Sequence, residues 1–345
     1  MHVILLTDVR YGRTASFVSS LAMGAMTFGE SNLWKLSGIG KETADKMIKK
    51  CVDTGINLFD TADIYDAGES EKLLGAVIKP YREQVMIATK MRGRMGPGIN
   101  QSGLSRHHMH IALRNSMERL ETDWVDIYQY HGWDTFTDFE EILSTMERFV
   151  QDGKVLYPAV SNFSAWQMST LQAMAQEKGY ARYESAQMNY NLLNRDIEYE
   201  ILPFMKYSKM TLLAWSPLHG GLLSGKYRKD EKPKEGYRMS DRGFFFPYFD
   251  DGRGWRIIDR VRKIAEDQGC KPSQVSLSWI VSKGHVALIG ARSIEQLEEN
   301  LETVNVNLKR SQIDSLDKLT AGKEMYPNWM IDRQGSDKKG FEIID

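Results

Sequence analysis

The sequence predicts one α/β domain folded as a (β/α)8 TIM barrel, and three observations lead to this prediction. Short apolar, β-prone segments alternate eight times with longer amphipathic segments. No polar linker interrupts the alternation, so a single domain spans residues 1–345, with its core at about 12–319. Polar residues recur where the apolar segments end. Regular strand–helix alternation implies parallel strands with right-handed crossovers, and eight units in one chain favour a closed barrel over an open doubly wound sheet.

The eight predicted strands are short segments rich in β-branched and aliphatic residues. They cover residues 21–26, 56–60, 85–89, 125–130, 156–160, 184–188, 211–215 and 286–289. The intervening segments place apolar residues at the helical period. The predicted helices cover residues 42–52, 69–78, 106–120, 139–151, 165–177, 196–208, 255–268, 272–283 and 294–304.

Two segments depart from the alternation. Residues 227–254 form a long loop rich in Gly, Pro, Lys and aromatic residues, and a loop of that length is usually functional or mobile. Its aromatic run, residues 242–249, is expected to close over the cofactor, to fill substrate space or to pack as padding against the outer rim of the barrel. The tail over 320–345 is expected to be irregular from residue 322 onward and to lie near the active-site rim.

Composition excludes several classes of function. A formal net charge of −1 offers no general attraction to nucleic acid or to an anionic membrane, and no apolar run is long enough for a membrane span. The two cysteines make no disulfide framework, so we expect a reducing compartment, the cytoplasm. Three histidines lie close together at 107, 108 and 110, but no further ligands complete a metal site, and we expect none. A homo-oligomer is compatible with the sequence.

Polar side chains stand at the carboxyl ends of successive predicted strands. Asp60 ends the second strand, and Lys90 and His131 follow the third and fourth strands. Ser161 and Asn162 follow the fifth strand, Gln187 lies within the end of the sixth, and Ser216 follows the seventh. In a β/α barrel these ends meet at one rim, where such barrels carry their chemistry. A lone buried Asp or Lys is costly, so we expect Asp60 and Lys90 to pair.

Tyr65 lies on the loop that leaves the second strand, five residues beyond Asp60. A nearby ammonium favours the phenolate, so Lys90 is expected to lower the tyrosine pKa from its usual value of about 10. His131 is placed to orient a carbonyl or share its proton. Each residue alone has an ordinary role as a cap, turn or loop residue, but together they describe proton delivery to a carbonyl oxygen. The hydride must then come from a cofactor.

The same residues carry a family resemblance. The run Asp60-Thr61-Ala62-Asp63-Ile64-Tyr65, with Gly68-Glu69-Ser70-Glu71 after it, closely resembles the signature of aldo-keto reductases. Collinear motifs continue the resemblance over roughly residues 12–319: Ile87-Ala88-Thr89-Lys90, Asp126-Ile127-Tyr128-Gln129-Tyr130-His131, Val160-Ser161-Asn162-Phe163, Gln187-Met188-Asn189-Tyr190, Trp215-Ser216-Pro217-Leu218 and Ile289-Gly290-Ala291-Arg292. Trp215 replaces the commoner tyrosine, as in the branch resembling potassium-channel β subunits and bacterial general-stress aldo-keto reductases.

The resemblance implies a catalytic tetrad of Asp60, Tyr65, Lys90 and His131, and an NADP(H) site. In the implied site Ser161, Asn162 and Gln187 hold the nicotinamide carboxamide, and Trp215 stacks on the ring. The full implied cofactor set is Gly24, Met26, Asp60, Ser161, Asn162, Gln187, Trp215, Ser216, Pro217, Leu218, Gly220, Ser224, Lys226, Arg238, Gly290, Arg292, Gln296, Glu299 and Asn300.

Arg292 precedes a helix expected to begin near Ser293, so a phosphate there would meet a guanidinium and a helix N-terminus. With Lys226 nearby, this favours the 2′-phosphate of NADPH over NADH. Gln296, Glu299 and Asn300 also fit an ordinary polar helix face.

The substrate is expected to be a small carbonyl compound or alcohol that contacts Trp34, Tyr65, His131 and Trp133, although loop packing also explains the two tryptophans. The predicted function is NADPH-dependent reduction of an aldehyde or ketone, or the reverse reaction. The alternative is an NADP(H)-binding regulatory subunit that senses redox state for a partner protein. A Schiff base on Lys90 is disfavoured, because Asp60 beside it would keep the amine protonated and poorly nucleophilic.

Overall fold

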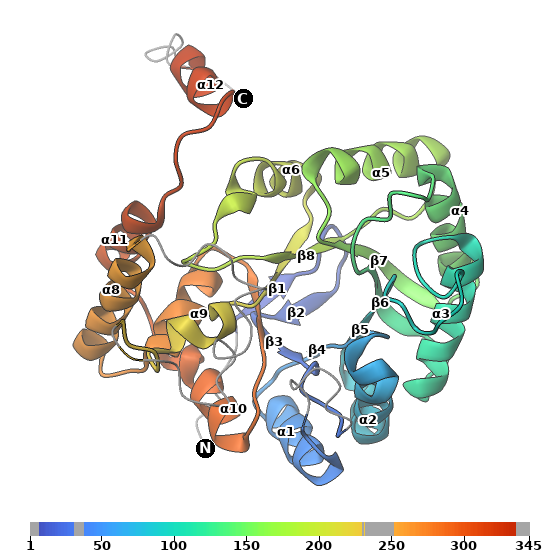
Figure 1. Cartoon of the computed structure of the whole chain (residues 1–345), viewed down its shortest axis with the longest axis horizontal. Helices are drawn as coiled ribbons and strands as arrows, with labels where there is room; N and C mark the ends of the chain where they lie inside the picture. The colour runs from blue at the N-terminus through green and yellow to red at the C-terminus, as the bar shows by residue number, and fades with distance from the viewer. Residues whose placement is uncertain (1–6, 31–37, 230, 232–251, 336–345) are drawn as a thin grey trace.

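The computed structural model describes residues 7–30, 38–229, 231 and 252–335, and it confirms the predicted barrel (Figure 1). Eight parallel strands close in the order β10-β3-β4-β5-β6-β7-β8-β9, so every strand beyond β3 pairs with its neighbour in sequence. Trp34, Arg238 and the aromatic run 242–249 lie outside the described residues.

The barrel strands lie close to the predicted ranges. They are β3 (Leu21–Gly24), β4 (Leu58–Asp60), β5 (Met86–Met91), β6 (Val125–Tyr130), β7 (Val155–Ser161), β8 (Ser185–Asn189), β9 (Thr211–Trp215) and β10 (Val286–Ile289). The register pairs Asp60 with Ala88, Lys90 with Gln129, and Ser161 with Gln187. This alignment brings the polar strand ends to one rim.

The helices surround the barrel. They are α1 (Lys41–Asp53), α2 (Glu69–Ile78), α3 (Arg106–Arg119), α4 (Phe139–Gln151), α5 (Ala165–Lys178), α6 (Ile201–Ser208), α8 (Arg253–Gln268), α9 (Pro272–Ser282), α10 (Ile294–Leu301), α11 (Arg310–Thr320) and α12 (Asn328–Gly335). Short 3-10 helices are η1 (Tyr65–Gly68), η2 (Lys79–Gln84), η3 (Asp196–Glu198), η4 (His219–Ser224) and η6 (Glu302–Asn305).

Three sequence predictions about helices were wrong in detail. The single helix predicted over 196–208 is split into η3 and α6, because Glu200 lies outside the helical region at φ −135°. The helix predicted over 294–304 changes to a 3-10 helix at Glu302. The tail predicted to be irregular from residue 322 contains α12. An eight-residue helix repeats its period too few times for sequence alone to reveal it.

An N-terminal hairpin, β1 (Asp8–Arg10) and β2 (Phe17–Ser19), belongs to the amino end of the barrel. After β1, Tyr11 is fully buried and its hydroxyl bonds Ser185 Oγ at 2.7 Å. Gly12 has φ 58°, and a Cβ there would lie 2.3 Å from Glu184, so only glycine fits this turn. The hairpin packs with an apolar layer inside the barrel that includes Ala88, Ile127 and Ala159. Apolar packing therefore closes the amino end of the barrel, and the polar residues lie at its carboxyl end.

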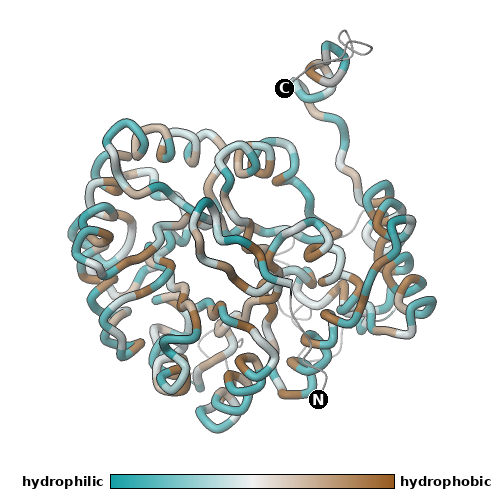
Figure 2. Tube along the Cα trace, turned by 180° about the vertical axis from the view of Figure 1, so that it is seen from behind, coloured by the Kyte–Doolittle hydropathy of each residue, from teal (hydrophilic) through white to brown (hydrophobic). Residues whose placement is uncertain are grey.

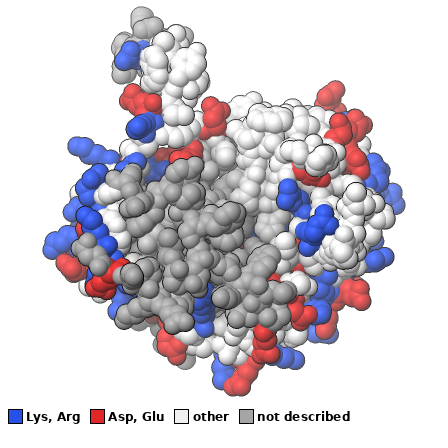
Figure 3. Space-filling view, in the orientation of Figure 1, with Lys and Arg blue, Asp and Glu red and all other residues white. Residues whose placement is uncertain are grey.

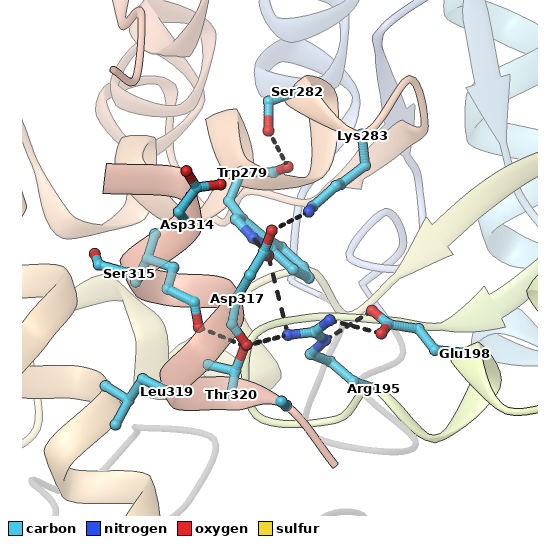
Figure 4. Close-up of polar contacts among 12 residues, drawn as sticks. Arg195, Glu198, Trp279, Ser282, Lys283, Asp314, Ser315, Asp317, Leu319 and Thr320 are labelled. Atoms are coloured by element: carbon cyan, nitrogen blue, oxygen red, sulfur yellow. Dashed lines mark hydrogen bonds and ion pairs between the residues drawn. The ribbon is translucent and has the colours of Figure 1, made fainter. Parts of the chain in front are cut away.

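The last helix of the barrel, α11, is fastened by a polar network (Figure 4). Asp317 accepts hydrogen bonds from Trp279 Nε1 at 2.8 Å and from Lys283 Nζ at 2.5 Å, which ties α11 to α9. Arg195, after β8, donates to Thr320 Oγ1 at 2.7 Å and pairs with Glu198 at 2.6 Å. Beyond α11 an extended segment leads to α12, which stands away from the barrel (Figure 1).

The surface is mixed in polarity and charge. Hydrophobic and hydrophilic residues alternate along the outer helices (Figure 2), as expected when one helical face packs on a barrel. Basic and acidic side chains are interspersed around the face shown in Figure 3, in line with the net charge of −1. Among the described helices, none has both the length and the apolar character needed to cross a membrane.

Candidate active site

Four of the predicted residues meet at the carboxyl rim of strands β4 to β6. Asp60 ends β4, Lys90 lies in β5, Tyr65 begins η1, and His131 follows β6 directly. The Lys90 ammonium donates to Asp60 Oδ1 at 2.5 Å, to Thr61 O at 2.8 Å and to the Tyr65 hydroxyl at 3.2 Å. Lys90 is 0% exposed and Asp60 1%. A buried ammonium thus touches both a carboxylate and a phenol.

A tight turn positions Tyr65 over the barrel. Asp66, Ala67 and Gly68 all have positive φ, at 50°, 57° and 95°, which reverses the chain before α2 begins. A Cβ on Gly68 would lie 2.7 Å from Arg119 Cδ, so glycine is required there. The ring of Tyr65 meets the ring of His131 edge-on, with centroids 5.7 Å apart.

The electrostatics differ from the sequence expectation in one respect. Burial raises the pKa of Tyr65 above its ordinary value, and although Lys90 acts to lower that pKa, it does not outweigh burial. Tyr65 is therefore a neutral phenol at physiological pH, with its proton available. Burial opposes the charge on Lys90 as well, but Asp60 and Tyr65 raise the pKa of Lys90 overall and keep it cationic. Burial, followed by Lys90 and Arg92, lowers the pKa of His131 to about 3, so its imidazole is neutral.

Two amides complete the surroundings of Asp60. Gln129 Nε2 and Gln187 Nε2 donate to Asp60 Oδ2 at 3.0 and 2.8 Å, and the two amides approach each other at 3.5 Å. An ionised carboxylate accepts only, so both glutamines must turn their NH2 groups toward Asp60. Sequence reasoning missed Gln129. The sequence feature that could have indicated Gln129 is its position two residues after Ile127, which places a polar side chain on the interior face of a buried strand.

The residues expected at the nicotinamide form a connected group on the next strands. Asn162, at φ 56°, donates to His131 O at 3.1 Å and to Ser161 Oγ at 3.0 Å. Its side-chain oxygen accepts the indole N–H of Trp215 at 3.0 Å. Asn162 therefore joins the proposed stacking ring to the histidine loop. Ser216 also has positive φ, 52°.

The loop after β9 contains the residues expected at the pyrophosphate. Pro217 and Leu218 lead into η4, where Gly220 and Gly221 have φ values of 64° and 94°. A Cβ on Gly221 would lie 2.8 Å from Lys226 Cε, so the lysine stem crosses directly over this backbone. Ser224 closes the turn through a 2.6 Å bond to Gly221 O.

The residues expected at the adenosine end gather where β10 meets α10. The Ser293 hydroxyl caps α10 by accepting a hydrogen bond from the backbone N–H of Gln296 at 3.3 Å. The side-chain Oε1 of Gln296 accepts one from the backbone N–H of Arg292 at 3.0 Å. Asn300 Nδ2 donates to Gly290 O at 3.3 Å. Glu299 accepts the Ser273 hydroxyl at 2.5 Å, which joins α10 to α9. The remaining members, Gly24 and Met26, are half-buried at the end of β3 and just beyond it.

Trp133 lies in an aromatic cluster outside His131. Its ring centroid lies 4.7 Å from that of Phe139, 5.3 Å from that of Phe163 and 6.1 Å from that of Trp166. These contacts support the loop-packing explanation for Trp133.

A closed parallel barrel with this lysine-centred cluster at its carboxyl rim fits the class of barrel oxidoreductases. The comparisons agree: the sequence model of the aldo/keto reductase family matches residues 20–321, and the chain belongs to that family. It is an oxidoreductase, and its family membership supports carbonyl reduction as its general chemistry. The family generally uses nicotinamide cofactors.

Its relatives include named oxidoreductases of similar length. A putative aryl-alcohol dehydrogenase of Saccharomyces cerevisiae, AAD14, is 30% identical, with 91% of this chain and 86% of that protein aligned. The uncharacterized oxidoreductase YrpG of Bacillus subtilis is 31% identical, with 90% of this chain and 95% of that protein aligned. Versiconal hemiacetal acetate reductase of Aspergillus parasiticus is 30% identical, with 91% of this chain and 97% of that protein aligned.

Proposed function

We propose that the protein reduces an aldehyde or ketone to an alcohol with NADPH, or catalyses the reverse reaction, with Tyr65 as the general acid. The observation that carries this proposal is the buried ammonium of Lys90, which contacts both Asp60 and the Tyr65 hydroxyl. A neutral phenol beside a fixed cation is suited to proton donation, because the cation stabilises the phenolate that remains.

The roles of the side chains follow from their charge states. NADPH, when bound, would supply the hydride for reduction of the carbonyl. The neutral imidazole of His131 orients the carbonyl by donating a hydrogen bond to its oxygen. Tyr65 gives its proton to that oxygen as negative charge develops there, and the phenolate left behind lies beside Lys90. Asp60 keeps Lys90 in place, and solvent returns the proton to Tyr65.

The residues present fit NADPH. The glycines of η4 adopt left-handed backbone conformations with no Cβ, which supports a turn that could pack closely against a pyrophosphate. The Trp215 indole is held by Asn162 as a platform for the nicotinamide. Arg292 next to the capped start of α10, with Lys226, supports a site for the 2′-phosphate. The nicotinamide carboxamide would be held by Ser161, Asn162 and Gln187. The adenosine would be held by Gly290, Gln296 and Asn300.

The direct test is turnover by the purified protein with NADPH and a panel of aliphatic and aromatic aldehydes and ketones, followed by loss of reduced nicotinamide absorbance. We expect saturable reduction of at least one carbonyl class, faster with NADPH than with NADH at equal subsaturating concentration. Tight NADPH binding without turnover of any carbonyl, or of alcohols with NADP+, would overturn the enzymatic proposal. That outcome would favour the regulatory alternative, although none of the three relatives described above is named as a regulatory subunit.

A further inference from the structure

Arg92 lies at the mouth of the barrel, directly after the last residue of β5. The ladder between β5 and β6 pairs Met91 with Tyr130, so its next step brings Arg92 beside His131. The backbone N–H of His131 donates to Met91 O at 2.9 Å, which continues the ladder to this point. Neighbouring strands lie about 4.8 Å apart, so the backbone of Arg92 is next to the histidine that would orient the substrate carbonyl.

The other side of Arg92 faces the loop that carries Tyr65. In the barrel β5 lies between β4 and β6, and the Tyr65 loop leaves β4. A Cβ on Gly93 would lie 2.7 Å from Ile64 Cδ1, so the chain just after Arg92 packs directly on the residue before Tyr65. Arg92 is therefore flanked by the loops of the two side chains that would contact the carbonyl oxygen.

The backbone of Arg92 adopts a conformation that favours glycine. Its φ is 126°, where a Cβ is crowded by the neighbouring backbone. The N–H of Gly103 donates to Arg92 O at 3.0 Å and helps to hold this conformation. Glycine would adopt the same φ without strain, and strained residues are concentrated at functional sites. An arginine side chain thus occupies a position where the backbone alone would favour glycine.

The guanidinium of Arg92 is open to a ligand. The residue is exposed, and no described residue accepts a hydrogen bond from its side chain or forms an ion pair with it. Asp134, on the loop after β6, already has its own donors. Its carboxylate accepts hydrogen bonds from two backbone N–H groups and one hydroxyl, those of Leu104, Phe136 and Thr137, at 2.7, 3.0 and 2.7 Å.

The charge of Arg92 acts on the proposed substrate site. Burial, followed by Lys90 and then by Arg92, lowers the pKa of His131 to about 3. The ammonium of Lys90 is balanced by Asp60 at 2.5 Å, whereas Arg92 has no carboxylate at ion-pair distance among the described residues. A negatively charged group on a substrate bound at His131 would therefore meet an unbalanced cation beside it.

We propose that the substrate carries, besides its carbonyl, an anionic group, a carboxylate or a phosphate, which the guanidinium of Arg92 binds. This inference rests on the proposed function and adds the chemical class of the substrate. The planar fork of a guanidinium matches two oxygen atoms of either group. The anionic group is remote from the reacting carbon, so its contact with Arg92 is alike in the ground state and the transition state. Loss of that contact should therefore appear mainly in KM.

Steady-state reduction by the full chain with NADPH tests the proposal on 4-carboxybenzaldehyde, its neutral methyl ester and 4-formylphenyl phosphate. The measured quantity is kcat/KM for each anion divided by kcat/KM for the ester. Differences in intrinsic reactivity among the aldehydes cancel when variants are compared. Arg92→Gln should lower the ratio for at least one anion by about tenfold or more, through KM. The anion with the larger fall identifies the group that is bound, and Arg92→Lys, which keeps the charge, should retain part of the ratio.

The same loop offers a matched control. Arg94 is also exposed, but its guanidinium donates to Gly96 O at 3.2 Å and to Gly98 O at 2.9 Å. Arg94→Gln should keep the wild-type ratios. Arg92→Gly keeps the test independent of folding, because glycine adopts a φ of 126° without strain. It should resist urea as well as wild type does and lose the anion preference as Arg92→Gln does.

Unchanged ratios in Arg92→Gln and Arg92→Gly, with the methyl ester still reduced, would overturn this inference and leave the proposed function intact. An equal fall in Arg94→Gln would also overturn it, because the effect would then be one of general surface charge. Weaker NADPH binding by Arg92→Gln with unchanged ratios would place a cofactor phosphate at Arg92 instead. Reduction of no carbonyl compound by the wild type would overturn the proposed function, and this inference with it.

Discussion

Replacing Tyr65 by Phe removes one oxygen atom from the centre of the proposed mechanism. A well-placed general acid contributes about 10²–10⁴ in rate, which corresponds to about 3–5 kcal/mol at the transition state. The fold should tolerate the change, since Lys90 keeps its contacts to Asp60 at 2.5 Å and to Thr61 O at 2.8 Å. We therefore expect turnover to fall by two to four orders of magnitude on the strength of general-acid catalysis alone, with NADPH affinity nearly unchanged.

Two measurements separate these effects. Single-turnover reduction of a saturating carbonyl substrate measures the chemical step, and quenching of intrinsic tryptophan fluorescence measures NADPH binding. Tyr128→Phe is the control, because Tyr128 is a fully buried tyrosine whose hydroxyl has no hydrogen-bond partner among the described residues. That variant should turn over like wild type.

The reasoning fails if Tyr65→Phe stays within a few-fold of wild type in the single-turnover step, since another group would then supply the proton. It also fails if both variants lose activity equally, because the loss would then reflect the removal of a buried hydroxyl in general.

Three further predictions rest on other contacts. Arg292→Ala should weaken NADPH far more than NADH in binding titrations, and an equal loss for both would refute the 2′-phosphate assignment. Gln129→Leu removes one of the two amides that donate to Asp60 Oδ2, so urea unfolding should show a loss of about 1.5–3 kcal/mol; unchanged stability would mean that this bond contributes nothing. Asp317→Ala leaves the buried Trp279 N–H without its acceptor and should cost about 1–3 kcal/mol. Burial alone would raise the pKa of Asp317, but Lys283 and Trp279 hold it below its usual value. The contribution of Asp317 to the free energy of unfolding is therefore complete above its pKa in the unfolded chain, about 4. This contribution is lost as the pH falls through the lower pKa of the folded protein. Chemical unfolding at several pH values should show the gap between wild type and Asp317→Ala narrowing in acid, and a gap that widens would contradict this sign.

Local patterns in the sequence were sufficient to predict the barrel and the position of the polar residues at its rim. A strand buried on both faces must be a short apolar run, and a helix that covers it must repeat its apolar residues at the helical period. For this reason β9 (Thr211–Trp215) and β10 (Val286–Ile289) end at the residues that the pattern predicted. Asp60 and Lys90 stood out because a polar residue ending such a run is costly without a partner.

Other features depend on residues that are distant in sequence, and only the tertiary structure decided them. Gln187 reaches Asp60 across 127 positions, and no local pattern encodes that hydrogen bond. The pKa of Tyr65 was expected to fall because Lys90 is near, yet burial raises this pKa overall, although Lys90 acts to lower it. Asp63 belonged to the recognised signature, but its burial became visible only once α3 was in place. The sequence by itself determined the elements and the residue types at the rim, because periodicity and burial cost act locally. Tertiary structure decided the hydrogen-bond partners and the charge states, because desolvation depends on everything packed around a group.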